Sequence, residues 1–141
     1  MTKEIAPKEI ASGARLMQLL NAYGVDTVFG MPGVHTLEAY RGLDGAGIRH
    51  IGVRHEQGAG FMADGYARVS GKPGVCLIIS GPGVTNAATP IGQAYSDSQP
   101  MLIISSVAAT NDLGMGRGML IGHLVQPATA FAEVGAVVDA G

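Results

Sequence analysis

The chain has 141 residues, a net charge of −2, 47% hydrophobic residues and only 14% charged residues. Its length corresponds to one domain, and charged residues usually make up about a quarter of such a domain. The low charge indicates a surface that another surface partly covers, although scattered apolar residues are also common on free surfaces. The chain has no basic run, which excludes the usual pattern for binding nucleic acids or anionic membranes.

The cysteine content and the N-terminal residues indicate the cellular location. Cys76, the single cysteine, lies in the apolar run 75–79, so we expect a buried structural thiol and no internal disulfide. Residues 1–8 lack the apolar core of a secretion signal, and no apolar run is long enough to span a bilayer. We therefore expect a cytoplasmic protein that has no membrane partner.

Helical segments and short apolar runs alternate along the chain. The pattern predicts helices over 15–23, 35–42, 58–69 and 85–96, and strands over 27–29, 48–53, 75–80 and 101–106. Ser12 is the expected N-cap of the first helix, and the expected buried stripe consists of Leu16, Leu19, Leu20 and Tyr23. This alternation predicts an α/β domain with a doubly wound, mostly parallel sheet flanked by helices. Ligands of such folds bind at the carboxyl ends of the strands.

One carboxylate occurs at such a strand end. Glu56 follows the predicted strand 48–53 and precedes a helix start rich in small residues. A carboxylate there, once covered by a partner, is able to exchange a proton with a ligand nitrogen. From its position alone, however, stabilisation of the helix N-terminus is the more common role.

Two glycine-rich turns follow other predicted strands. The segments 30–33 (GMPG) and 81–83 (GPG) are tight turns whose backbone is able to approach a flat or anionic ligand. Asn86, beyond the second turn, is either a hydrogen-bonding residue of such a site or part of a helix cap. His35, beyond the first, is either a ligand contact or the start of a helix.

The remaining candidates lie nearer the C-terminus. The segment 111–118 contains three glycines, and Arg117 within it is either a contact for a substrate carboxylate or an ordinary surface residue. This segment lacks the glycine spacing of a nucleotide-binding turn. The four histidines and the single cysteine lack the spacing of metal ligands, so no metal site is predicted.

Taken together, these segments resemble the N-terminal, pyrimidine-binding domain of thiamine diphosphate-dependent enzymes of the acetolactate synthase type. The resemblance covers about residues 10–110 and rests on RHEQGAGFMADGYAR, from Arg54, and on GPGVTN, from Gly81. The stretch PGVHTLEAYRGL, from Pro32, is more similar to 5-guanidino-2-oxopentanoate decarboxylases than to true acetolactate synthases.

The resemblance implies a function and a set of site residues. Glu56 would bind the aminopyrimidine ring of thiamine diphosphate and act as the catalytic proton shuttle of a 2-oxo-acid decarboxylase or carboligase. The implied cofactor-binding residues are Pro32, Gly33, Glu56, Pro82, Gly83 and Asn86. The candidate substrate contacts are Val34, His35, Arg117 and His123, the last lying where the resemblance weakens beyond Leu120.

The family's second domain, which binds the diphosphate and Mg²⁺, has no counterpart in this sequence. We therefore interpret residues 1–141 as a single pyrimidine-binding domain, truncated at its C-terminus, that obtains Mg²⁺ only through a diphosphate-binding partner domain and forms homo-oligomers. Alone, such a chain is expected to be inactive. The alternative is a non-catalytic oligomerisation or scaffold module that keeps the fold.

Overall fold

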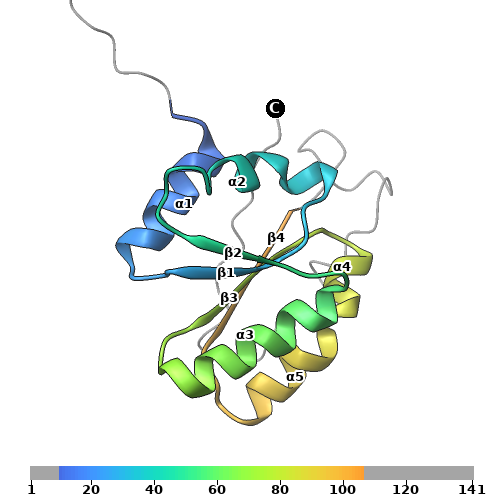
Figure 1. Cartoon of the computed structure of the whole chain (residues 1–141). Helices are drawn as coiled ribbons and strands as arrows, with labels where there is room; N and C mark the ends of the chain where they lie inside the picture. The colour runs from blue at the N-terminus through green and yellow to red at the C-terminus, as the bar shows by residue number, and fades with distance from the viewer. Residues whose placement is uncertain (1–9, 107–141) are drawn as a thin grey trace, which may run out of the picture.

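The computed structural model describes residues 10–106, and its central feature is a sheet of four parallel strands (Figure 1). The strands are β1 (Thr27–Gly30), β2 (Arg49–Gly52), β3 (Gly74–Ile78) and β4 (Met101–Ser105), and they lie in the order β2-β1-β3-β4. After β1 the chain adds β2 on one side of it, then passes back to add β3 on the other side. The predicted doubly wound parallel sheet is therefore confirmed.

Helices cover both faces of the sheet (Figure 1). On one face lie α1 (Ser12–Ala22), the short 3₁₀ helix η1 (Val34–Thr36) and α2 (Leu37–Arg41). The other helices are α3 (Glu56–Ser70), α4 (Pro82–Asn86) and α5 (Ala88–Ser96), and α3 and α5 pack side by side on the opposite face. None of the helices within residues 10–106 is long and apolar enough to cross a membrane.

The side chains of β3 alternate between two hydrophobic clusters. Val75 and Leu77 belong to the cluster on the side of α1 and α2, and Cys76 and Ile78 belong to the cluster on the side of α3. All five residues of β3 are buried. A central parallel strand that is covered on both faces has to be apolar throughout, which explains the uninterrupted run in the sequence.

The buried side of α1 differs from the prediction. Met17 and Leu20 are buried, whereas Leu19 and Tyr23 are 53% and 81% exposed. The stripe that faces the protein begins at Gly13, because a Cβ there would lie 2.1 Å from the carbonyl oxygen of Glu38 in α2. This close approach of α1 to α2 determines which side of α1 is buried.

The expected cap of the first helix was also wrong. Ser12 is the first residue of α1 itself, and Ala11 occupies the N-cap position without a side-chain hydrogen bond. The prediction relied on the preference of serine for N-caps, which is a local preference that packing overrides.

The helix predicted over 85–96 is two helices. The first begins early, at Pro82, because proline at the start of a helix needs no N–H partner. The break follows from Pro90, which lacks the N–H that would bond the carbonyl of Asn86 and continue the first helix into the second. The helix predicted over 35–42 also differs at its start, where the chain forms a 3₁₀ turn that begins at Val34.

The helices α3 and α5 approach each other closely. A Cβ on Gly60 of α3 would lie 2.3 Å from Cγ of Pro90 in α5. One turn further along, Asp64 is buried and accepts hydrogen bonds from Arg68 Nε (2.9 Å) and from Gln93 Nε2 of α5 (3.2 Å). Small residues at the start of α3 and a bonded carboxylate in its middle thus hold the two helices together.

The thiol of Cys76 is expected to be inert in the folded chain. Cys76 is fully buried, and this burial raises the pKa of its thiol from 9.0 to about 12. Because thiolate is the reactive form, iodoacetamide at pH 8 should leave the native chain unlabelled and should modify one thiol per chain in urea. The free energy of unfolding should fall as the pH rises above about 9, because only the unfolded chain then ionises this group. Rapid labelling of Cys76 in the native chain, detected by mass spectrometry, would contradict this burial.

Candidate functional site

The two glycine turns and Glu56, which the sequence singled out, lie at the carboxyl ends of three adjacent strands. Gly30, the last residue of β1, is paired with Gly52 of β2 on one side and with Leu77 of β3 on the other. The chain connects β1 to β2 on one side and β3 to β4 on the other, so β1 and β3 flank a switch point, where doubly wound folds bind their ligands.

Glu56 lies at this edge as the first residue of α3 and is 4% exposed. The preceding residue, His55, is the N-cap, and its Nδ1 accepts a hydrogen bond from the backbone N–H of Gln57 at 3.2 Å. The imidazole therefore caps the helix, while Glu56 lies in the first turn, where the helix dipole favours a negative charge, as the alternative from its position expected. The carboxylate of Glu56 points toward Asn86 of α4.

The carboxylate of Glu56 contacts the turn that follows β3. Its Oε2 accepts a hydrogen bond of 2.9 Å from Nδ2 of Asn86, which lies at the end of α4. Within residues 10–106, the structure records no hydrogen-bond partner for Oε1. Asn86 is therefore a hydrogen-bond donor in the site and leaves one acceptor of a buried carboxylate available.

Gly83 lies against this carboxylate. A Cβ at that position would come within 3.4 Å of Glu56 Oε1 and within 2.9 Å of Cγ1 of Ile79. A Cβ on Gly33 would lie 2.1 Å from Cγ2 of the same isoleucine. Packing inside the protein thus accounts for glycine at both positions, and the approach of a ligand along their backbone stays a prediction.

The turn after β1 is held by a threonine. Thr36 Oγ1 accepts a hydrogen bond from the N–H of Gly33 and donates one to its carbonyl oxygen, each 3.0 Å long. Pro32, Val34 and His35 are exposed beside this turn, with Val34 at 80%. His35 lies within η1 and Val34 begins it. The remaining two candidates, Arg117 and His123, lie outside the described residues.

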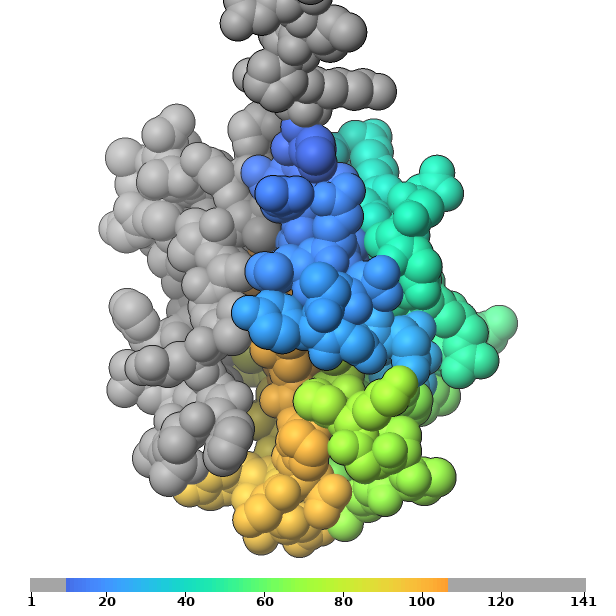
Figure 2. Space-filling view, turned by 90° about the vertical axis from the view of Figure 1, so that its left-hand side faces the viewer, coloured from blue at the N-terminus to red at the C-terminus, as the bar shows by residue number. Residues whose placement is uncertain are grey.

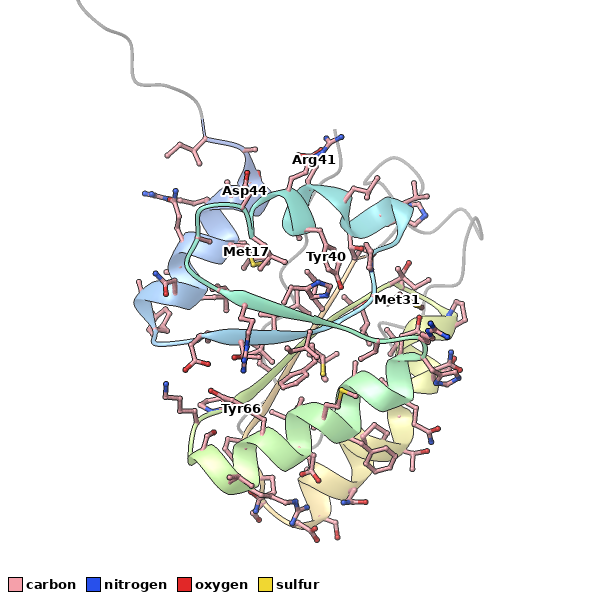
Figure 3. The ribbon with its side chains drawn as sticks, in the orientation of Figure 1. Met17, Met31, Tyr40, Arg41, Asp44 and Tyr66 are labelled. Atoms are coloured by element: carbon pink, nitrogen blue, oxygen red, sulfur yellow. The ribbon has the colours of Figure 1, made fainter. Side chains whose placement is uncertain are left out.

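A partly buried tyrosine links α2 to the strand ends. The Tyr40 hydroxyl donates a 2.8 Å hydrogen bond to the carbonyl of Leu77 in β3, and its ring meets His50 edge to face at 5.0 Å. In Figure 3 Tyr40 points from α2 toward the sheet, whereas Arg41 points away from it. Burial raises the pKa of the Tyr40 hydroxyl far above its usual range. The sequence gives no sign of this contact, because an aromatic residue in a short helix is not a signal of function.

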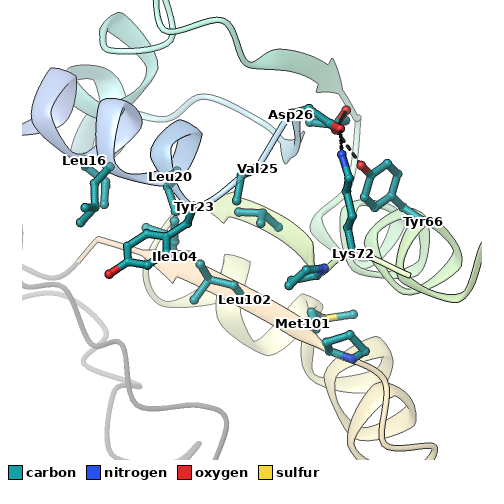
Figure 4. A pocket seen from close by; sticks show the side chains of 16 residues that line it. Leu16, Leu20, Tyr23, Val25, Asp26, Tyr66, Lys72, Met101, Leu102 and Ile104 are labelled. Atoms are coloured by element: carbon teal, nitrogen blue, oxygen red, sulfur yellow. Dashed lines mark hydrogen bonds and ion pairs between the residues drawn. The ribbon is translucent and has the colours of Figure 1, made fainter. Parts of the chain in front are cut away.

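A pocket of about 560 Å³ lies at the opposite, amino end of the strands. Figure 2 shows this face, where α1 (blue) lies near the start of β4 (orange). The pocket is lined mainly by apolar side chains, with Asp26, Tyr66 and Lys72 at its edge (Figure 4). Asp26 binds Lys72 Nζ at 2.5 Å and the Tyr66 hydroxyl at 2.6 Å, and these contacts, chiefly that with Lys72, hold the pKa of its carboxyl far below its usual range. This pocket is separate from Glu56.

The fold and the strand-end carboxylate define the class of the protein. The protein is a doubly wound α/β domain, the class that binds ligands at its switch point, and here the switch point carries a buried carboxylate and two glycine turns. Within residues 10–106 no group of three or more His, Cys, Asp or Glu side chains is placed to hold a metal ion.

The chain belongs to the family described as "Thiamine pyrophosphate enzyme, N-terminal TPP binding domain", which matches residues 11–131. It is 64% identical over 134 residues to a probable 2-ketoarginine decarboxylase of Pseudomonas aeruginosa, covering 90% of this chain and 24% of that protein. It is 50% identical over 109 residues to the acetolactate synthase large subunit of Buchnera aphidicola subsp. Schizaphis graminum, covering 75% and 19%. The Haemophilus influenzae large subunit is 49% identical over 108 residues, covering 76% and 19%.

These comparisons confirm the resemblance that was read from the sequence. The chain spans about a quarter or less of the length of these curated relatives. The similarity to a protein named for 2-ketoarginine, which is 5-guanidino-2-oxopentanoate, also agrees with the expectation from the PGVHTLEAYRGL stretch.

Proposed function

We propose that this chain is the pyrimidine-binding half of a thiamine diphosphate-dependent 2-oxo-acid decarboxylase or carboligase, in which Glu56 activates the aminopyrimidine ring. The observation that carries this proposal is the buried carboxylate of Glu56, which has Oε2 bonded to Asn86 and Oε1 available among the described residues. Membership of the thiamine pyrophosphate family supports it independently.

The described residues fit the pyrimidine end of the cofactor. An aminopyrimidine ring is flat and carries nitrogen-bound protons, and Oε1 of Glu56 is able to accept one of them. Asn86 holds Oε2, so the same oxygen always faces the ring, and Glu56 takes up and returns the proton at Oε1. The two adjoining turns contribute the other proposed cofactor-binding residues, Pro32, Gly33, Pro82 and Gly83. The cofactor, when bound, supplies the electron sink for cleaving the 2-oxo acid.

The diphosphate end of the cofactor needs other ligands. We propose that a diphosphate-binding domain of the same family binds the diphosphate and Mg²⁺, and that two such halves meet in a cytoplasmic homo-oligomer. Exposed apolar side chains on α3 and α5, which include Phe61, Met62 and Tyr95, support a surface that is covered in an assembly. Residues 1–141 contribute one pyrimidine-binding domain to it.

The proposed substrate is 5-guanidino-2-oxopentanoate. The support is the 64% identity to the probable 2-ketoarginine decarboxylase, which exceeds the identity to the two acetolactate synthase subunits compared above. Val34 and His35, exposed on η1 beside the site, are the candidate contacts within the described residues. Arg117 and His123 are further candidates, with Arg117 suited to a carboxylate.

A graft tests the proposal. This chain would replace the matching quarter of the Pseudomonas aeruginosa relative, and the purified graft would be assayed for release of CO₂ from 5-guanidino-2-oxopentanoate, with pyruvate as comparison. We expect activity that requires thiamine diphosphate and Mg²⁺ and favours the guanidino substrate. A graft that folds and assembles but neither binds the cofactor nor turns over would contradict the proposal and favour the non-catalytic scaffold.

A further inference from the structure

We propose that Ile79, which no sequence motif includes, is a positioning residue of this site. It follows β3 directly, is half-buried, and lies between the two glycine turns. The inference rests on the proposed function, because it assigns a role to Ile79 through Glu56 and the turns. It does not require Ile79 to touch the cofactor or the substrate.

The first step is the contact with the turn after β1. The Cγ2 methyl group of Ile79 fills the space that a side chain on residue 33 would need. A Cβ built on Gly33 would lie only 2.1 Å from this methyl group. The backbone of Gly33 has φ −143° and ψ 166°, an extended conformation that any residue adopts. Glycine is therefore needed at this position because of Ile79, and not because of its backbone conformation.

The second step is the contact with the turn after β3. Cγ1 of Ile79 would lie 2.9 Å from a Cβ on Gly83, and the same Cβ would meet Oε1 and Cγ of Glu56 at 3.4 and 3.5 Å. Gly83 lies inside α4 and has no positive φ, unlike Gly81, whose φ is 65°. Close packing again accounts for the glycine.

The two contacts use the two branches at Cβ of one side chain. One branch meets the turn of Gly33, and the other meets the turn that carries Gly83, beside the carboxylate of Glu56. Because packed interiors transmit small displacements, a change of branching at residue 79 moves one turn relative to the other. The position of Glu56 relative to the Gly33 turn therefore depends on a β-branched residue at position 79.

Three substitutions separate branching from volume. Ile79→Val keeps both γ carbons and loses one methyl group, Ile79→Leu keeps the carbon count and loses the branching at Cβ, and Ile79→Ala loses both. If Ile79 only filled volume, leucine would be tolerated better than valine. We expect the reverse order, with Ile79→Leu lowering kcat of the graft about tenfold and Ile79→Val lowering it less.

A spectroscopic readout reports the site without any cofactor. The side-chain amide of Asn86, bonded to Glu56 Oε2, gives ¹⁵N–¹H signals in the 141-residue chain. Ile79→Leu should shift these signals, whereas the control Ile103→Leu should leave them in place. Ile103 is a partly buried isoleucine of β4 that packs in the cluster on the α3 side.

A size exchange tests the contact with Gly33 directly. Gly33→Ala alone should lower the melting temperature of the chain sharply or prevent folding, because its Cβ meets Cγ2 of Ile79. The double variant Gly33→Ala/Ile79→Ala removes the colliding methyl group and should recover much of the loss. A double variant no more stable than Gly33→Ala, or a Gly33→Ala chain as stable as the wild type, would overturn the inference.

The outcomes distinguish this inference from the proposed function. The Asn86 signals and the size exchange are measured in the free chain, so they stand if the graft shows no thiamine-dependent activity. An active graft in which Ile79→Leu matches Ile103→Leu in kcat and in the Asn86 signals would leave the proposed function intact and remove the role of Ile79.

Discussion

Glu56→Gln is expected to lower the decarboxylation rate of the graft by about 10²- to 10⁴-fold, the usual contribution of a general acid–base group. The amide has nearly the shape of the carboxylate, so the fold should persist. Asn86 Nδ2 donates to one oxygen of Glu56 and would select the amide oxygen of the glutamine. The amide nitrogen would then take the place of Oε1 and present a donor where the proposal needs a proton acceptor.

The measurement is kcat for 5-guanidino-2-oxopentanoate at saturating thiamine diphosphate and Mg²⁺. The matched control is Glu38→Gln, an exposed glutamate of α2 whose partner is Arg41 on the same helix. We expect the control to remain within about twofold of the parent, because exposed ion pairs contribute little. If Glu56→Gln also retained activity within tenfold of the parent, Glu56 would not be the proton-transferring group.

The second large effect concerns the contact of α3 with α5. Gly60→Ala is expected to destabilise the chain by about 3 kcal/mol, because the new methyl group would lie 2.3 Å from Cγ and 2.8 Å from Cβ of Pro90. The proline ring cannot rotate away as a flexible side chain does, so the two helices would have to move apart. The free energy of unfolding in urea, measured on the 141-residue chain, tests this expectation.

Gly65→Ala in the same helix is the matched control. A Cβ on Gly65 meets nothing within 4 Å, and alanine favours a helix over glycine by roughly 0.5–1 kcal/mol. The control should therefore stabilise the chain by about that amount. Equal effects of the two substitutions would mean that helix propensity, and not the contact with Pro90, determines the outcome at Gly60.

The sequence by itself determined the class of fold and the location of the site. Alternating apolar runs and helical segments depend on local periodicity, and they predicted the parallel sheet and its flanking helices, apart from the break within 85–96 and the 3₁₀ start of 35–42. The motifs around Glu56 and Gly81 identified the family, which the match over residues 11–131 confirms. Because strand ends of a doubly wound sheet converge, the same pattern also placed Glu56 and the two glycine turns at one edge.

The tertiary structure decided which residues meet there. The bond between Asn86 and Glu56 joins residues 30 positions apart, and the local pattern was equally compatible with a helix cap at Asn86. Ile79 gave no signal, because an isoleucine at the end of an apolar run is expected in any core. The buried side of α1 was likewise settled by Gly13 packing on α2. Each of these depends on packing between distant segments, and local periodicity carries no information about such contacts.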